Sequence, residues 1–151
     1  MGIDPNGGRP VGPAREVEVG YALPPLTKHV TTARINKFEA SGIIEDRPNI
    51  HTDPEAARRA GLGASPIGSG RMTTAYLSQL MGAFFGDAWN HTSKIGINFI
   101  RPVRDGDTIT VRATVKEKVA EADGMRVVFD VYAENQNGDK TAVGWASAVV
   151  P

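Results

Sequence analysis

The sequence predicts an α+β protein in which one antiparallel sheet covers one central helix. The longest stretch with helical spacing runs from residue 70 to about residue 85, and four segments with the alternation of β-strands follow it. Turn signals separate these four segments, and no internal repeat is visible. A long helix followed by a run of neighbouring strands is typical of an α+β domain.

The N-terminal part divides into an expected tail, residues 1–14, and the start of a single domain, residues 15–151. The first 13 residues hold four glycines and three prolines and too few apolar side chains to offset the entropy of ordering them. Residues 16–23 alternate well enough for a strand, and Pro24-Pro25 would end it because proline donates no amide hydrogen bond.

Two short helices are predicted before the long one. Thr32 can cap the first, and Gly42 can close it in the left-handed conformation. Asp53 can cap the second, which starts with Pro54 and ends near residue 59 or 60. We expect these helices and their loops to form an overhang beside the sheet.

The long helix is expected to start after Ser69, which stands at the capping position. The residues that form one mostly apolar stripe along it are Met72, Ala75, Tyr76, Gln79, Leu80, Ala83 and Phe84. Tyr76, Trp89 and the Phe84-Phe85 pair are most simply core or interface residues.

Everything after Gly86 is interpreted as strands, over residues 94–100, 108–116, 127–133 and 141–150. The last strand has a face of small residues, which a helix can approach closely, namely Ala142, Gly144, Ala146 and Ala148. Its other face is also apolar, through Val143, Trp145 and Val149. An apolar outer face predicts a partner, so we expect a homodimer or a higher oligomer.

Composition excludes several classes of protein. The chain has no cysteine, so we expect no disulfide or thiolate site and a reducing, cytoplasmic location. Lysine plus arginine equals aspartate plus glutamate at 17 each, which leaves no basic field to attract nucleic acid. The three histidines lack metal-ligand spacing, and no apolar stretch approaches the ~20 residues of a membrane span.

The polar segment 45–53 is the first candidate for chemistry. Asp46 and His51 are five residues apart with Pro48 between them, so both side chains could converge on one water molecule. A carboxylate beside an imidazole can hold a nucleophilic water and move its proton. The alternative is that His51 and Asp53 only hydrogen-bond the start of the following helix.

Gly68-Ser69-Gly70, at the start of the long helix, is the second candidate. Unpaired amides at a helix start carry partial positive charge and can stabilise an oxyanion. Arg71 in the first turn could bind an anion. An ordinary capped loop with an exposed arginine explains the same residues.

Several segments together resemble the MaoC-like, R-specific enoyl-CoA hydratases. The segments that carry the resemblance are 38–42, 49–58, 68–70, 98–103 and 106–107, within about residues 30–148. The family motif, Ser-Gly-Asp-x-Asn-Pro-x-His, has its aspartate five residues before its histidine. Asp46 and His51 keep this spacing.

The resemblance implies a hotdog fold, in which a curved antiparallel sheet wraps a long helix and subunits pair into dimers. It implies a lyase of fatty acid metabolism that hydrates a 2-enoyl thioester or dehydrates a 3-hydroxyacyl thioester. The substrate would be an acyl-CoA or an acyl-carrier thioester, so that coenzyme A enters only as part of the substrate, with no other cofactor and no metal.

The resemblance also implies roles for individual residues. His51 would be the base, Asp46 would share the water and return a proton to C2, and the Gly70 amide would face the thioester oxygen. Ser69, Asn49 and Arg71 would belong to the oxyanion and substrate-binding group.

Some alternatives stay open. Three residues separate Ser41-Gly42 from Asp46, so Glu45 could replace Asp46 as the acid. Arg71 could recognise an anionic group on the acyl chain. An acyl-CoA thioesterase on the same fold, or a non-catalytic hotdog subunit that binds an acyl group or supports a partner, would also fit.

Overall fold

The computed structural model describes residues 14, 16–42 and 48–151. Its elements in chain order are β1 (Leu26–His29), α1 (Thr32–Ala40), α2 (Pro54–Arg59), β2 (Ile67–Gly68), α3 (Gly70–Phe85), α4 (Asp87–Thr92), β3 (Lys94–Phe99), β4 (Val103–Arg104), β5 (Thr108–Glu121), β6 (Gly124–Glu134) and β7 (Lys140–Val150). Among these residues no helix is both long and apolar enough to cross a membrane.

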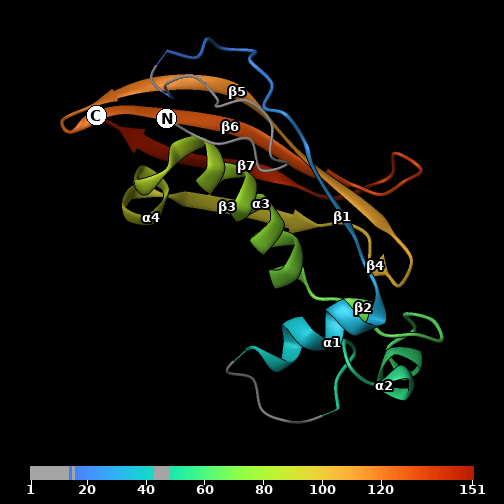
Figure 1. Ribbon diagram of the computed structural model, residues 1–151. Helices are drawn as coiled ribbons and strands as arrows, with labels where there is room; N and C mark the ends of the chain where they lie inside the picture. Colours follow the sequence, from blue (N-terminus) through green and yellow to red (C-terminus); the bar gives the residue numbers. More distant parts are fainter. Residues whose placement is uncertain (1–13, 15, 43–47) are drawn as a thin grey trace.

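The main sheet has five antiparallel strands in the order β1-β5-β6-β7-β3. Its long strands β5, β6 and β7 curve over α3, while α1 and α2 lie beyond the first turn of that helix (Figure 1). The register of β5 against β6 shifts between Val115 and Glu117, where an irregularity of this kind increases strand twist and bending. The predicted α+β layout of one sheet over one long helix, with an overhang of short helices, is confirmed.

The core lies between α3 and the inner face of the sheet. Leu77, Leu80 and Met81 of α3 are almost fully buried there. The ring centroids of Phe84 and Phe129 lie 5.3 Å apart in an edge-to-face arrangement. The small-residue face predicted for the last strand is confirmed, since its alanines at 142, 146 and 148 are completely buried in the core.

The first strand is not where the alternation predicted it. Residues 16–23 form no strand, although Gly20, Tyr21 and Leu23 make backbone hydrogen bonds with β5 and Ala22 forms a bridge with Thr114. The paired strand β1 starts after the two prolines, and Leu26 to His29 face residues 111 to 108 of β5. Both segments bond to β5, but only Leu26 to His29 keep a continuous antiparallel register with it, and alternation within residues 16–23 could not indicate that register.

Helix α4 was missed, because every residue after Gly86 was interpreted as strand or turn. Six residues are too few to show helical periodicity, yet Trp89 anchors this helix with 7% of its surface exposed. Its indole Nε1 donates to the Ser78 hydroxyl at 2.8 Å. The prediction that Trp89 and the Phe84-Phe85 pair belong to the core is confirmed.

The ends of α1 also differ from prediction. Thr31, one residue earlier than expected, caps the helix, and its hydroxyl accepts a hydrogen bond from the Arg34 amide at 3.2 Å. Ser41 ends the helix in a right-handed conformation, and Gly42 does not adopt a positive φ. The cap that was predicted at Asp53 is confirmed by its hydrogen bond from the Glu55 amide at 2.9 Å.

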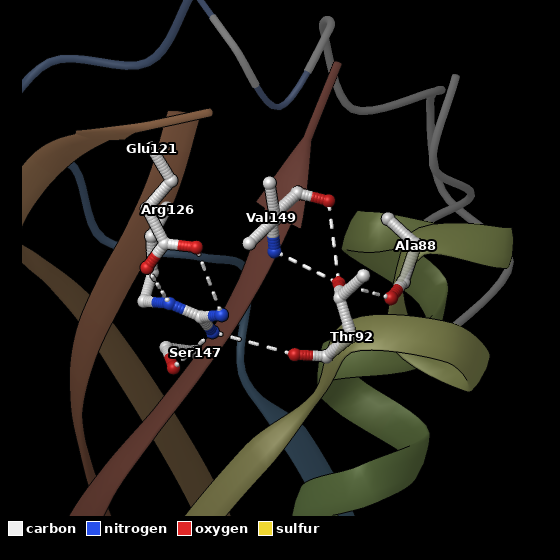
Figure 2. A network of polar contacts seen from close by, with 6 residues as sticks. All are labelled: Ala88, Thr92, Glu121, Arg126, Ser147 and Val149. Carbon is white, nitrogen blue, oxygen red and sulfur yellow. Dashed lines mark hydrogen bonds and ion pairs between the residues drawn. The ribbon is translucent and has the colours of Figure 1, made fainter. Parts of the chain in front are cut away.

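A polar network fastens the end of α4 to the sheet (Figure 2). The Thr92 hydroxyl donates to the Ala88 carbonyl at 2.7 Å and accepts from the Val149 amide at 2.9 Å. Arg126 donates to the Thr92 carbonyl at 3.3 Å and to Glu121 at 2.6 Å. The network therefore supplies hydrogen bonds where the β3–β7 ladder stops, at the Lys94–Ser147 pair.

Candidate functional site

The turn that carries His51 is organised around Asn49. The side-chain oxygen of Asn49 accepts from the His51 amide at 2.8 Å, and its carbonyl accepts from the amides of Thr52 and Asp53. The turn is tied to β2, because the Ile67 amide donates to the Ile50 carbonyl at 3.1 Å. Asn49 thus fixes the backbone on which the imidazole stands.

A single hydrogen bond sets the protonation pattern of the His51 ring. Its Nδ1 lies 2.9 Å from the carbonyl oxygen of Ile67. A carbonyl oxygen can only accept, so Nδ1 carries the proton and donates it. In the neutral ring Nε2 then keeps its lone pair, which is the form that a general base needs.

His51 and Gly70 line one cavity of about 270 Å³. The full lining is His51, Ile67, Gly68, Gly70, Thr73, Phe99, Ile100, Arg101, Pro102, Val103 and Thr141. The structure therefore brings together two residues that were singled out from separate parts of the sequence. Carbon atoms dominate the walls, and few polar groups project into the cavity, which is typical of small-molecule sites.

The start of α3 lacks the side-chain cap that was expected of Ser69. Ser69 occupies the N-cap position, but its hydroxyl makes no capping hydrogen bond and has no partner among the residues described here. The residue is buried, with 3% of its surface exposed. The Met72 amide instead bonds the Ser69 carbonyl at 3.0 Å. No side-chain oxygen of the described residues therefore caps this helix start in the way that Thr31 and Asp53 cap theirs.

Gly70 is required by packing as well as being available for chemistry. A Cβ atom on Gly70 would lie 2.6 Å from two ring carbons of Phe99, much closer than ordinary contact. Only glycine lets this ring lie on the first residue of the helix. Phe99 remains 54% exposed, so it forms a wall of the cavity rather than part of the core.

Arg71 does not line the cavity. Its guanidinium pairs with the carboxylate of Glu39 at 3.1 Å and lies over the Phe38 ring, 5.8 Å from the centroid. The Glu39 side chain is 5% exposed and that of Arg71 48% exposed, so the arginine neutralises a buried carboxylate on α1. The structure thus gives Arg71 a partner within the chain.

Asp46 and Glu45 lie outside the residues that the structure describes. The structure therefore gives no distance between either of these carboxylates and His51. Within residues 14, 16–42 and 48–151 there is no group of three or more histidine, aspartate or glutamate side chains that could hold a metal ion.

Sequence reasoning did not place several residues that line the cavity at the site, among them Thr73, Phe99 and Thr141. Thr73 was within reach of prediction, because it stands one helical turn after Gly70. Phe99 belongs to segment 98–103, which carried part of the resemblance, but nothing there indicated its place. Thr141 comes from β7, and only the completed sheet brings it to the site.

Comparison with known proteins supports the same fold. Residues 18–137 match the family described as MaoC like domain. The R-hydratase PhaJ1 from Pseudomonas aeruginosa has a TM-score of 0.73 at 26% identity, over 92% of this chain and 85% of that chain.

The (R)-hydratase from A. caviae involved in PHA biosynthesis has a TM-score of 0.70 at 24% identity, over 91% and 99% of the two chains. The ChsH1-ChsH2 complex from Mycobacterium tuberculosis has a TM-score of 0.71 at 18% identity, over 89% and 98%. These last two likenesses show the fold alone. No curated protein matches the chain.

Proposed function

Because the chain belongs to the family of MaoC-like domains, we propose that it is a hotdog-fold lyase that adds water to a 2-enoyl thioester and reverses this reaction on a 3-hydroxyacyl thioester. One observation carries the proposal. The hydrogen bond from His51 Nδ1 to the Ile67 carbonyl leaves the lone pair on Nε2, which has no partner among the described residues, on a side chain that lines the same cavity as Gly70.

In the proposed reaction, His51 Nε2 takes a proton from water as its oxygen attacks C3 of the enoyl group. The C2–C3 double bond opens, and the electron pair moves through C2 to the thioester oxygen. The Gly70 amide donates to that oxygen, because a helix start without a side-chain cap is suited to an anion. The thioester carbonyl then re-forms as the electron pair returns to C2 and takes up a proton. That proton is the one His51 removed from water, passed on through Asp46, so both side chains end as they began and the 3-hydroxyacyl product is complete.

The turn and the helix start would support this chemistry. Asn49 holds the backbone of His51, so its contribution is to orient the base. Ser69 has a buried hydroxyl without a partner among the described residues, next to Gly70, and it is a candidate donor to the substrate. The substrate is proposed to be a coenzyme A or carrier-protein thioester, with no other cofactor.

We also propose that the chain works as a homodimer or in a larger hotdog assembly, in the cytoplasm. Trp145, on the outer face of β7, is 43% exposed, and strand β3 lies at an edge of the sheet. An apolar outer face beside an edge strand is suited to a protein partner. The ChsH1-ChsH2 neighbour is itself a complex.

The test is incubation of the protein with short 2-enoyl-CoA esters, with the conjugated double bond and free thiol measured in parallel. We expect the double bond to disappear without release of thiol. His51→Ala and Asp46→Asn should each lower the rate by a factor of about 100 or more. His91→Ala is the matched control, since His91 is exposed on α4 and should leave the rate unchanged.

Release of thiol with the double bond intact would assign a thioesterase instead. A folded protein that leaves a panel of enoyl thioesters unchanged would support a non-catalytic acyl-binding subunit and contradict the proposal.

A further inference from the structure

A second cavity, of about 600 Å³, lies where β1, α1 and α3 meet. It is lined by Thr27, Lys28, His29, Arg34, Lys37, Phe38, Ser41, Met72 and Tyr76. None of these residues lines the cavity of His51, and the proposed hydration uses none of them. We call this second space the basic cavity.

The basic cavity has an excess of positive charge. Lys28, Arg34 and Lys37 are cationic at neutral pH, and no carboxylate among the described residues lines the space with them. Two carboxylates on nearby segments have other partners. Glu39 pairs with Arg71, and Asp105 accepts a hydrogen bond from the Thr32 amide at 2.5 Å. In a chain with zero net charge, this is a local concentration of cations.

Two of the cations are held toward the cavity by the fold. Lys28 is half-buried on the same side of β1 as Leu26, which is 2% exposed, and its ammonium lies 5.9 Å from the centre of the Tyr76 ring. The Arg34 guanidinium donates to the His29 carbonyl at 2.5 Å. A half-buried ammonium and a fixed guanidinium are partly preorganised to receive an anion.

The remaining wall is largely apolar, with one phenol. Phe38 and Met72 contribute carbon surface, and Tyr76 contributes the ring that lies beside the Lys28 ammonium. Burial raises the pKa of Tyr76, and the nearby Arg34 opposes this only in part, so the phenol stays protonated at neutral pH. No hydrogen-bond partner of its hydroxyl occurs in the described part of the chain, so that group can donate to a ligand.

We propose that the basic cavity binds a small organic anion. Its phosphate or carboxylate head lies near Lys28, Arg34 and Lys37, and its apolar body rests on Phe38, Met72 and Tyr76. Three cations favour a phosphate monoester, which carries about −1.5 to −2 charges at pH 7, over a single carboxylate. The proposal does not depend on the hydratase activity.

A purely structural explanation exists for Lys28 alone. An inward-pointing lysine on an edge strand discourages pairing with other chains, and β1 is an edge of the sheet. That explanation accounts for neither the basic cavity nor the presence of Arg34 and Lys37 beside it, and it predicts no bound ligand.

The test is a titration followed by amide NMR with three probes of equal apolar length: hexyl phosphate, hexanoate and hexanol. We expect saturable shifts in β1, α1 and the first turns of α3, with hexyl phosphate bound at least about tenfold more tightly than hexanol and more weakly as salt rises. Tighter binding of hexanoate than of hexyl phosphate would support the site with a carboxylate as the natural head group.

Lys28→Met and Lys37→Met should each weaken hexyl phosphate binding several-fold. Lys116→Met is the matched control, because Lys116 is exposed on β5 beside Asp130. This variant should bind hexyl phosphate as the wild type does. Signals far from the cavity report in the same spectra that each variant is folded. The proposal is overturned if hexanol binds as tightly as hexyl phosphate, if the shifts centre on His51, or if Lys28→Met and Lys37→Met bind like the wild type.

Discussion

Replacing Gly70 by alanine isolates the contact between the start of α3 and Phe99. The new Cβ would meet two ring carbons of Phe99 at 2.6 Å, whereas ordinary contact begins at 3.4 Å, so the ring must move by the better part of an ångström. Forcing an extra methyl group into a packed site costs about 1–3 kcal/mol, while alanine in place of glycine in a helix returns about 0.5–1 kcal/mol. The difference is about 0–2.5 kcal/mol, and because the Phe99 ring is 54% exposed and can move, we expect Gly70→Ala to lower the free energy of unfolding by about 1 kcal/mol.

Gly82→Ala in the same helix is the matched control. There the nearest atom to a new Cβ would be Cδ1 of Trp89 at 3.5 Å, which is ordinary contact. Without a clash, only the helix propensity remains, and we expect a gain of up to about 1 kcal/mol. Urea denaturation of both variants gives the comparison directly.

A double-mutant cycle completes the test. In a Phe99→Ala background, Gly70→Ala should lose most of its cost, because the clashing ring is gone. The reasoning is refuted if Gly70→Ala is as well tolerated as Gly82→Ala, or if its cost is the same with and without the Phe99 ring.

Three further predictions concern the polar contacts of the fold. Thr92→Val should lower the free energy of unfolding by about 1–3 kcal/mol in urea, because it leaves a strand amide of β7 without its acceptor, and Thr92→Ser should restore most of the loss. The hydrogen bond from Arg126 holds the pKa of Glu121 below its usual value, with a smaller contribution from the charge of Lys94. The pair therefore contributes stability above the unfolded-state pKa of the carboxyl, and this stability is lost as pH falls through the folded-state pKa. A carboxyl NMR titration should show the lowered pKa, and Arg126→Met should remove most of the shift. Arg71→Met should destabilise the protein by up to about 3 kcal/mol, because it leaves a buried carboxylate uncompensated, and adding Glu39→Gln should recover much of that loss in the same denaturation assay. An unfolding curve of Arg71→Met that matches the wild type would contradict the last of these.

Local signals in the sequence predicted some of the local features and missed others, such as the caps expected of Thr32 and Ser69. The pair Asp53-Pro54 correctly predicted the cap and the first residue of α2. The apolar stripe correctly predicted α3, Gly70–Phe85. The alternation after Gly86 located the strands of the sheet, although β5 proved longer than the predicted 108–116 because its distal half pairs with β6 after the register shift.

Features that depend on distant contacts could not be predicted in this way. The carbonyl that fixes the His51 ring belongs to Ile67, 16 residues later in the chain, and no spacing rule indicates it. Phe99 reaches Gly70 only because β3 joins the edge of the sheet. The pairing of Arg71 with Glu39 is equally non-local, since the two residues are 32 positions apart. The role of Asp46 rests on motif spacing and stays a prediction.

The most direct test of the central claim is the tautomer of His51, read from its ring nitrogen shifts by ¹⁵N NMR at a pH of about 8, well above the ordinary histidine pKa of about 6.5. We predict a proton on Nδ1, bonded to the Ile67 carbonyl, and an unprotonated Nε2. A proton on Nε2 would place the lone pair on Nδ1, against the Ile67 carbonyl, where it cannot activate water, and it would contradict the account.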